Sequence, residues 1–172
     1  MKVIYWEIFE NESLPLLLAA TEKGLCYAGS PGSGDSECEA LIQKRYPGAR
    51  LVKMEEPLKP YITEFSEYLE GRRMGFTMQL DSSGTAFQEG VWEALRQIPY
   101  GETVCYSDIA NMIGKPTAVR AVGSAIGANP VLIVVPCHRV VGKDGSMTGF
   151  REGLDMKRFL LDLEKKNNLA IV

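Results

Sequence analysis

The first half of the chain consists of short apolar or alternating segments separated by turn residues. This pattern predicts strands over residues 3–9, 15–20, 25–28, 50–54 and 76–80. It predicts helices over residues 37–46 and 57–70, the second because Ile62, Phe65 and Leu69 repeat at helical spacing. These segments carry no histidine, and their acidic residues are spaced as on a solvated surface. We therefore expect a small α/β unit that serves as a scaffold.

The pattern changes after residues 81–84, an Asp-Ser-Ser-Gly stretch typical of a linker. Thr85 followed by Gln88 forms a capping-box sequence that predicts a helix start. Residues 107–113 and 117–128 predict two further helices joined by a Gly-Lys-Pro turn, which is helix-turn-helix geometry. The sequence thus predicts an α+β protein of two domains, 1–81 and 82–172.

The second helix of this pair has an unusual composition. Its apolar face repeats at Val119, Val122 and Ile126, small residues fill much of the rest, and Arg120 is its one long polar residue. A helix that reads bases needs long hydrogen-bonding side chains, which this helix lacks. Two interpretations remain: tight packing between helices, or a helix laid into a narrow DNA groove that contacts shape and phosphate.

Composition narrows the possible classes of protein. The 172 residues are 45% hydrophobic and 24% charged, which is typical of a soluble globular protein. Residues 1–81 carry 9 basic and 13 acidic side chains and residues 82–172 carry 10 and 9, which is compatible with modest DNA binding. No apolar stretch reaches the length of a membrane span, and four cysteines without a CxxC pair, with a single histidine, predict reduced thiols and no zinc site. We expect a cytoplasmic protein without cofactors.

Candidate chemistry centres on Pro136-Cys137-His138-Arg139, which places a thiol beside the only histidine. The apolar run 131–135 predicts a buried strand that ends at Pro136. A thiol is a useful nucleophile as thiolate, and imidazole can accept its proton near neutral pH. Neighbouring residues of an extended segment point to opposite faces, so proton transfer would need a bridging water or a turn. The alternative is a buried structural cysteine.

Several motifs occur in one order: Tyr106, Arg120-Ala121-Val122-Gly123, Asn129-Pro130, the Pro-Cys-His-Arg-Val-Val block at 136–141, Gly149-Phe150 and Gly153-Leu154 before a helix that reaches Glu164. Together they resemble the O6-alkylguanine-DNA alkyltransferase family over residues 82–166. The N-terminal part is similar in length and strand–helix pattern. The resemblance implies a ribonuclease-H-like N-terminal domain and a helix-turn-helix, winged-helix-like C-terminal domain.

The resemblance also implies a reaction and its residues. A methyl or small alkyl group on guanine O6, with thymine O4 as a further candidate, passes irreversibly to Cys137 in a single turnover. Glu164 orients His138, which accepts the thiol proton through a water, and the spacing of Met156, Leu160 and Glu164 lets the acid share the apolar face of its helix. Asn129 holds the turn before the active segment.

DNA binding is implied through the minor groove of a duplex, with little sequence preference and a monomeric protein. Tyr106 rotates and binds the extruded nucleotide, which leaves the stack because its O6 lies inside the duplex. Arg120 fills the vacated place. The remaining implied contacts to DNA or the base come from Ala121, Gly123, Val140, Phe150 and Arg151.

Two positions depart from the family. Phe150 stands where tyrosine is common, and Arg151 stands where a small residue is common, which changes the expected size of the base pocket. Two other classes compete with a repair alkyltransferase. A non-catalytic damage-sensing relative would replace the cysteine, which is present here. A thiol hydrolase would need a base placed directly on the thiol and an oxyanion hole, and would leave the helix-turn-helix unexplained.

Overall fold

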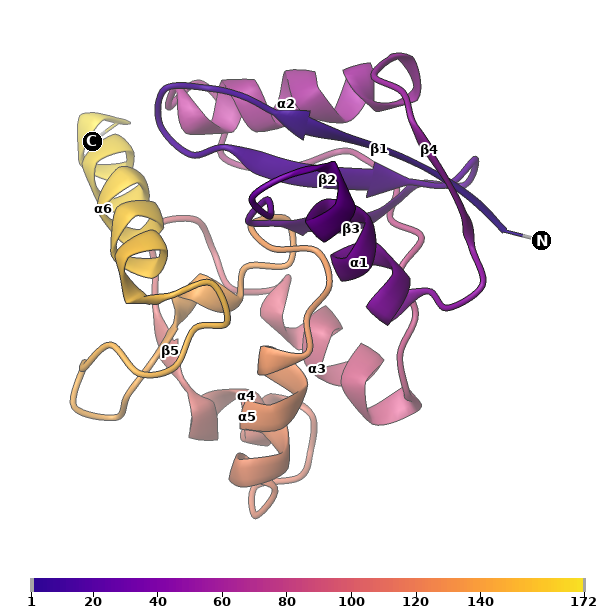
Figure 1. Cartoon of the computed structure of the whole chain (residues 1–172). Helices are drawn as coiled ribbons and strands as arrows, with labels where there is room; N and C mark the ends of the chain where they lie inside the picture. Colours follow the sequence, from indigo (N-terminus) through magenta and orange to yellow (C-terminus); the bar gives the residue numbers. More distant parts are fainter. Residues whose placement is uncertain (1, 172) are drawn as a thin grey trace. The chain divides into compact units, whose positions relative to one another are not determined.

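The computed structural model describes residues 2–171, without the side chains of residues 169–171. The chain divides into two compact units, Met1–Ser82 and Ser83–Val172 (Figure 1), and each is described by itself. We refer to them as the N-terminal unit and the C-terminal unit. Within the described residues, no helix is long and apolar enough to cross a membrane.

A four-stranded sheet forms the centre of the N-terminal unit. Its strands are β1 (Val3–Phe9), β2 (Leu16–Ala20), β3 (Leu25–Gly29) and β4 (Arg50–Lys53), in the order β3-β2-β1-β4. The β1–β2 and β2–β3 pairs are antiparallel, whereas β1 and β4 are parallel. A parallel pair needs a crossover connection, and the chain makes it through α1 (Asp35–Arg45). Four of the five strands that the sequence predicts for this unit are confirmed.

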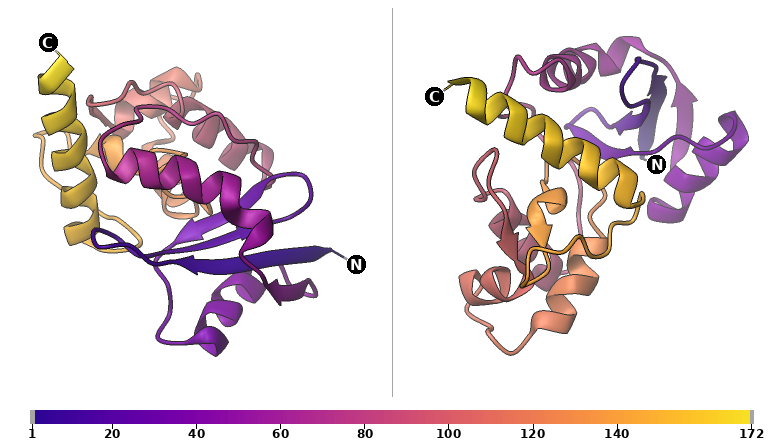
Figure 2. Two further views of the ribbon diagram at one scale, coloured as in Figure 1. Left: turned by 90° about the horizontal axis from the view of Figure 1, so that it is seen from above. Right: turned by 90° about the vertical axis from the view of Figure 1, so that its left-hand side faces the viewer.

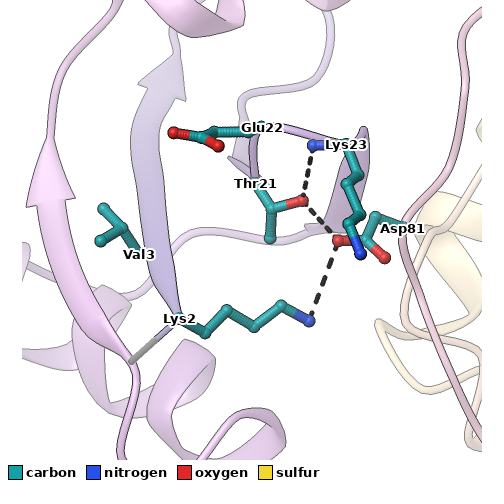
Figure 3. Close-up of a pocket in the computed structure, with 6 residues that line it drawn as sticks. All are labelled: Lys2, Val3, Thr21, Glu22, Lys23 and Asp81. Atoms are coloured by element: carbon teal, nitrogen blue, oxygen red, sulfur yellow. Dashed lines mark hydrogen bonds and ion pairs between the residues drawn. The ribbon is translucent and has the colours of Figure 1, made fainter.

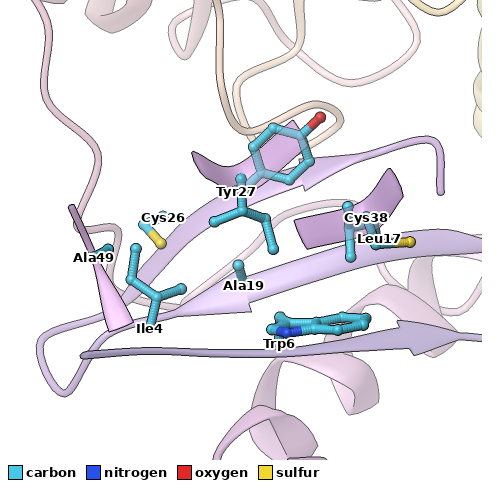
Figure 4. Close-up of a cluster of buried hydrophobic side chains, with 9 residues drawn as sticks. Ile4, Trp6, Leu17, Ala19, Cys26, Tyr27, Cys38 and Ala49 are labelled. Atoms are coloured by element: carbon cyan, nitrogen blue, oxygen red, sulfur yellow. The ribbon is translucent and has the colours of Figure 1, made fainter. Parts of the chain in front are cut away.

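Helices cover both faces of this sheet. η1 (Glu56–Leu58) leads into α2 (Lys59–Leu69), and α1 and α2 lie on opposite faces (Figures 1 and 2). All five residues of β2 are buried as a result. On the α1 face, the sheet and the helix share a cluster that joins Trp6 and Leu17 to Cys38 and Ile42 (Figure 4). Because most of this cluster is aliphatic or aromatic, it serves stability rather than chemistry.

The prediction of a strand over residues 76–80 is wrong. Within the described residues, Leu80 makes a single isolated bridge with Leu25, and the rest of the segment has no ladder. Phe76 packs instead against Phe65 and Tyr68 of α2, with ring centroids 5.4 Å apart in both pairs. The segment is extended because its side chains pack on a helix, and apolar alternation alone cannot distinguish this from pairing in a sheet.

The C-terminal unit is mainly helical. Its helices are α3 (Ala86–Leu95), α4 (Tyr106–Met112), α5 (Val119–Gly127) and α6 (Leu154–Ile171), and a short parallel pair joins β5 (Val104–Cys105) to β6 (Val140–Val141). The predicted capping box is confirmed, because Thr85 Oγ1 accepts from Gln88 N (3.1 Å) and Gln88 Oε1 accepts from Thr85 N (3.0 Å). With the sheet of the N-terminal unit, this confirms the α+β class.

Helices α4 and α5, with the turn between them, form the predicted helix-turn-helix pair. Val122 and Ile126 are buried as predicted, but Val119 is 37% exposed because α5 begins there and its first turn leaves the core. Trp92 of α3 fixes the other side of α5 by donating from Nε1 to the Ala125 carbonyl (2.8 Å). The exposed side of α5 therefore carries Arg120 with Ala121, Ser124 and Gly127.

The apolar run 131–135 is not a strand, contrary to the prediction. It forms a coil in which Val135 N donates to the Val131 carbonyl (3.1 Å) and Ile133 has a φ of 75°. A β-branched residue in this left-handed region costs of order 1–3 kcal/mol and persists where the surrounding structure enforces it. Every residue from 131 to 141 is buried, so the apolar character reflects the burial of a coiled segment rather than pairing in a sheet.

Candidate active site

Cys137 opens a 3-10 turn, η2 (Cys137–Arg139), directly after this coil. Its N–H donates to the Val135 carbonyl (2.8 Å), and the residue is 4% exposed. The sequence predicts a strand end here, where neighbouring side chains would point to opposite faces. A tight turn removes that constraint on Cys137 and His138, since successive residues no longer alternate between two faces.

The thiol of Cys137 contributes to a cavity of about 170 Å³ in the C-terminal unit. Residues of α4, α5, the coil and the loop before α6 line it: Tyr106, Gly123, Ile126, Gly127, Leu132, Cys137, Gly149, Phe150 and Arg151. A Cβ added at Gly123 would lie in ordinary contact with the Tyr106 ring, at 3.9 Å, so this position of α5 faces Tyr106. A small molecule or an extruded base that enters the cavity would meet the sulfur.

A larger cavity of about 300 Å³ lies in the N-terminal unit and has a different character (Figure 3). Its lining pairs Lys2 Nζ with Asp81 Oδ2 (3.8 Å), and Thr21 Oγ1 donates to the same carboxylate. No thiol or imidazole lines it, so among the cavities of the described residues we place the candidate chemistry at Cys137.

His138 and Glu164 form a buried pair. His138 Nε2 lies 2.7 Å from Glu164 Oε2, and both side chains are almost completely buried. An ionised carboxylate accepts hydrogen bonds, so we assign the imidazole proton to Nε2 and a bare lone pair to Nδ1. His138 Nδ1 is buried and has no hydrogen-bond partner among the described residues. A base with one orienting partner and one free nitrogen can accept a proton, directly or through a bound water.

Arg139 holds the same carboxylate from a second side. Its Nε donates to Glu164 Oε1 (2.8 Å) and its Nη2 to Oε2 (2.9 Å), while Gly101 N donates to Oε1 (3.2 Å). Burial alone would raise the pKa of Glu164, but the hydrogen bonds from His138 and Arg139 outweigh it and hold that pKa well below its usual range. Glu164 is therefore a fixed negative charge.

Burial disfavours the charged forms of both the Cys137 thiol and the His138 imidazole. Burial raises the pKa of the Cys137 thiol, although hydrogen bonding with Asn129 and the charges of Arg151 and Lys157 oppose this. Burial lowers the pKa of His138, Glu164 acts against it, and the charges of Arg139 and Lys157 lower it further. Charge separation between sulfur and imidazole therefore needs a proton to move within the site.

Asn129 fixes the coil that precedes Cys137. Its Nδ2 donates to the Val135 carbonyl (2.9 Å), its Oδ1 accepts from Val131 N (3.0 Å), and the residue is buried. Arg151 Nη1 donates to the backbone carbonyl of Asn129 (2.7 Å), which ties the loop before α6 to the same coil. Asn129 thus satisfies backbone groups that a strand would have paired in a ladder.

Lys157 is a residue that sequence reasoning missed. This buried side chain donates from Nζ to the carbonyls of Val140 (2.6 Å) and Thr148 (2.7 Å), and Tyr106 Oη donates to the same Thr148 carbonyl (3.3 Å). The ammonium thereby ties β6 to the loop that forms one wall of the cavity. Its position seven residues before Glu164 was the available signal, since that spacing returns to the same helix face.

The structure brings most predicted site residues together. Tyr106, Gly123, Phe150 and Arg151 line the cavity with Cys137, while His138 and Glu164 lie buried together and Asn129 braces the coil. Val140 is completely buried and lies outside the cavity lining, and its carbonyl accepts from Lys157 Nζ (2.6 Å). Outside the cavity lining, the exposed side of α5 carries Arg120 and Ala121.

Helix-turn-helix pairs are a common means of binding DNA, and this pair has a cysteine in a cavity beside its second helix. Fold and site together define the class of DNA-binding proteins that carry a cysteine next to the helix pair. Within that class, the chain belongs to the 6-O-methylguanine DNA methyltransferase family: residues 4–82 match its ribonuclease-like domain and residues 86–166 match its DNA binding domain.

Individual relatives agree. An inducible methylated-DNA–protein-cysteine methyltransferase of Bacillus subtilis is 53% identical over 163 residues, which cover 95% of this chain and 91% of the relative. The crystal structure of Mycobacterium tuberculosis O6-methylguanine methyltransferase matches with a TM-score of 0.81 at 35% identity, over 95% of this chain and 94% of that one. Mycobacterium tuberculosis OGT in complex with DNA matches with a TM-score of 0.78 at 36% identity, over 96% and 94%. The family resemblance and the fold class are confirmed.

Proposed function

We propose that this chain is a DNA repair protein that transfers a methyl or small alkyl group from O6 of guanine in duplex DNA to Sγ of Cys137. O4 of thymine is a second acceptable donor. The observation that carries the proposal is the cavity that holds Cys137 beside the helix-turn-helix pair, together with the buried His138–Glu164 pair next in the chain. The names of the Bacillus subtilis and Mycobacterium tuberculosis relatives support it.

The reaction proceeds in two proton-balanced steps. A water in contact with the free Nδ1 of His138 carries the Sγ proton to the imidazole, leaving a thiolate and an imidazolium that Glu164 stabilises. The thiolate then attacks the alkyl carbon, so that an S–C bond forms while the C–O bond to guanine breaks. The guanine anion takes the proton back from the imidazolium. The thioether has no good leaving group, so each protein molecule reacts once.

The DNA is bound through its minor groove by α5, with little sequence preference. The exposed Arg120 enters the stack where the nucleotide has left, and the small Ala121 and Gly123 let the helix approach the backbone closely. Tyr106 lines the cavity and bonds the extruded base there. The protein acts as a monomer without a cofactor, and the N-terminal unit serves as scaffold for the C-terminal unit that does the chemistry.

The loop before α6 sets the shape of the base pocket. Phe150 contributes a ring without a hydroxyl, and Arg151 lines the same cavity, where its backbone contacts the base. A backbone contact from Val140, which is buried and outside the lining, requires this residue to become accessible when the base enters. The Arg151 guanidinium is held by the Asn129 carbonyl and by Glu152 (2.8 Å), so it restricts the cavity from a fixed position. A small alkyl group is therefore favoured over a bulky one.

The test is stoichiometric repair. A duplex with one O6-methylguanine is incubated with increasing protein and then digested to nucleosides. We expect one O6-methylguanine to disappear for each protein molecule added, and Cys137→Ser to remove none while it still binds the duplex. Catalytic turnover, or binding without loss of O6-methylguanine by the wild type, would contradict the proposal. The second result would indicate a damage-sensing protein instead.

A further inference from the structure

The buried Glu164 carboxylate is shared between two side chains that are adjacent in sequence. Arg139 contacts both carboxylate oxygens, at 2.8 and 2.9 Å, and His138 contacts Oε2 at 2.7 Å. The proposed reaction uses the histidine and the glutamate and assigns nothing to the arginine. Yet Arg139 is itself buried, and a guanidinium is seldom buried without a charged partner.

Arg139 cannot readily leave this position. Its Nη1 donates to the Ile98 carbonyl (2.7 Å), and its guanidinium lies over the Tyr100 ring, 5.6 Å from the centroid. Lys157, the other buried cation among the described residues, donates instead to two backbone carbonyls. The Tyr100 hydroxyl is neutral at physiological pH, since burial first and the nearby Glu164 charge raise its pKa. The positive charge that meets Glu164 in a two-oxygen contact is therefore that of Arg139.

We propose that Arg139 is a positioning residue whose charge balances Glu164, so that His138 stays neutral and can accept the proton of Cys137. The inference rests on the proposed function for its purpose, because a base that already holds a proton cannot receive one. It adds to that function an electrostatic role for the fourth residue of the Pro-Cys-His-Arg block.

Proton accounting shows what the charge achieves. With Arg139 present, the buried Arg–Glu pair is neutral, and the thiol proton moves to His138 without exchange with solvent. Without that charge, the buried carboxylate is left with His138 as its ionisable partner, and the His–Glu pair takes up one proton from solvent. Forming the thiolate then requires release of a proton to solvent. At pH values below the thiol's pKa, the rate of transfer would therefore increase about tenfold for each unit by which the pH is raised, instead of being independent of pH.

The single histidine allows a direct measurement of this charge state, because its NMR signals cannot be confused with others. We compare the wild type, Arg139→Gln, which removes the charge, and Arg139→Lys, which keeps it but loses the two-oxygen contact. In the wild type we expect a neutral imidazole protonated at Nε2, with half-titration below 6.5, the ordinary pKa of histidine. Arg139→Gln should show an imidazolium at neutral pH, and Arg139→Lys should resemble the wild type. A neutral imidazole in a folded Arg139→Gln variant overturns the proposal.

Single-turnover rates with the methylated duplex separate this role from a merely structural one. We expect a level pH profile for the wild type and for Arg139→Lys, and the tenfold-per-unit slope for Arg139→Gln. Parallel profiles for all three would mean that Arg139 only supports the fold, and would contradict the inference. If Arg139→Gln does not fold, the wild-type titration remains a test, since half-titration above pH 7 would mean an imidazolium at neutral pH and contradict a neutral resting base. Absence of methyl transfer from the wild type would refute the proposed function and leave the NMR result standing.

Discussion

Replacing Asn129 with alanine should destabilise the C-terminal unit by removing the clamp on the coil before Cys137. The buried side chain makes two hydrogen bonds to the backbone: its Oδ1 accepts from Val131 N (3.0 Å) and its Nδ2 donates to the Val135 carbonyl (2.9 Å). The two backbone groups differ in what they lose. The Val135 carbonyl keeps a second donor, Cys137 N at 2.8 Å, whereas the loss of Asn129 Oδ1 removes the acceptor for Val131 N.

The magnitude follows from this difference. An unsatisfied buried N–H costs about 1–3 kcal/mol, and loss of a bond whose acceptor keeps another partner costs about 0.5–1.5 kcal/mol. We therefore expect Asn129→Ala to lower the free energy of unfolding by about 1.5–4.5 kcal/mol. Asn111, exposed on α4, provides the matched control, and Asn111→Ala should change stability by no more than about 0.5 kcal/mol.

Denaturant unfolding followed by tryptophan fluorescence can measure this loss of stability in the C-terminal unit, which contains Asn129. The chain has two tryptophans, Trp6 in the N-terminal unit and Trp92 in the C-terminal unit, so a Trp6→Phe background leaves Trp92 as the reporter. A loss below about 0.5 kcal/mol for Asn129→Ala, equal to that of the control, would refute the claim that this side chain holds the coil.

Three further predictions concern Arg120, Arg151 and Glu164. Arg120→Ala should slow repair of duplex DNA more than reaction with free O6-benzylguanine, and equal losses in single-turnover assays would argue against a role in extrusion. Arg151→Ser should speed the reaction with O6-benzylguanine at least about tenfold relative to O6-methylguanine. Removing a group fixed at the cavity should lower the activation free energy with the bulky substrate by more than about 1.4 kcal/mol. An unchanged ratio of the two rates would contradict this. The folded-state pKa of Glu164 lies below its ordinary value of 4.5, so its stabilisation is present above pH 4.5 and is lost as the pH falls through the lower, folded-state pKa. Unfolding midpoints measured down this pH range should therefore fall more for the wild type than for Glu164→Gln, and equal slopes would contradict the assignment.

Local signals in the sequence predicted much of the fold. The Thr85–Gln88 capping box and the spacing that leads to Glu164 both depend on neighbours within one or two helical turns, which a sequence displays directly. The run at 131–135 misled because β-branched residues are favoured wherever backbone is buried. What turns this run into a coil is the Asn129 side chain, whose hydrogen bonds replace those of a ladder. A pattern of apolar positions does not contain that information.

The sequence predicts the reactive residues of the candidate site and the supporting Asn129, but it does not predict the supporting roles of Arg139 and Lys157. Cys137 and His138 are indicated by their chemical type and adjacency, whereas the role of Glu164 is implied by the family resemblance, with which its place on a helix face agrees. The contacts of Arg139 with Ile98 and of Lys157 with Thr148 depend on how the segments pack in three dimensions. Charged residues of this kind look like ordinary surface groups in a sequence until their burial is known.

The central claim is that Cys137 itself accepts the alkyl group. Intact-mass measurement with peptide mapping, after incubation with a duplex that contains one O6-methylguanine, tests it most directly. The account predicts a gain equal to the replacement of one hydrogen by one methyl group, located on Cys137 and saturating at one per protein molecule. The methyl group on another residue, or an unchanged mass while O6-methylguanine is lost from the DNA, would contradict it.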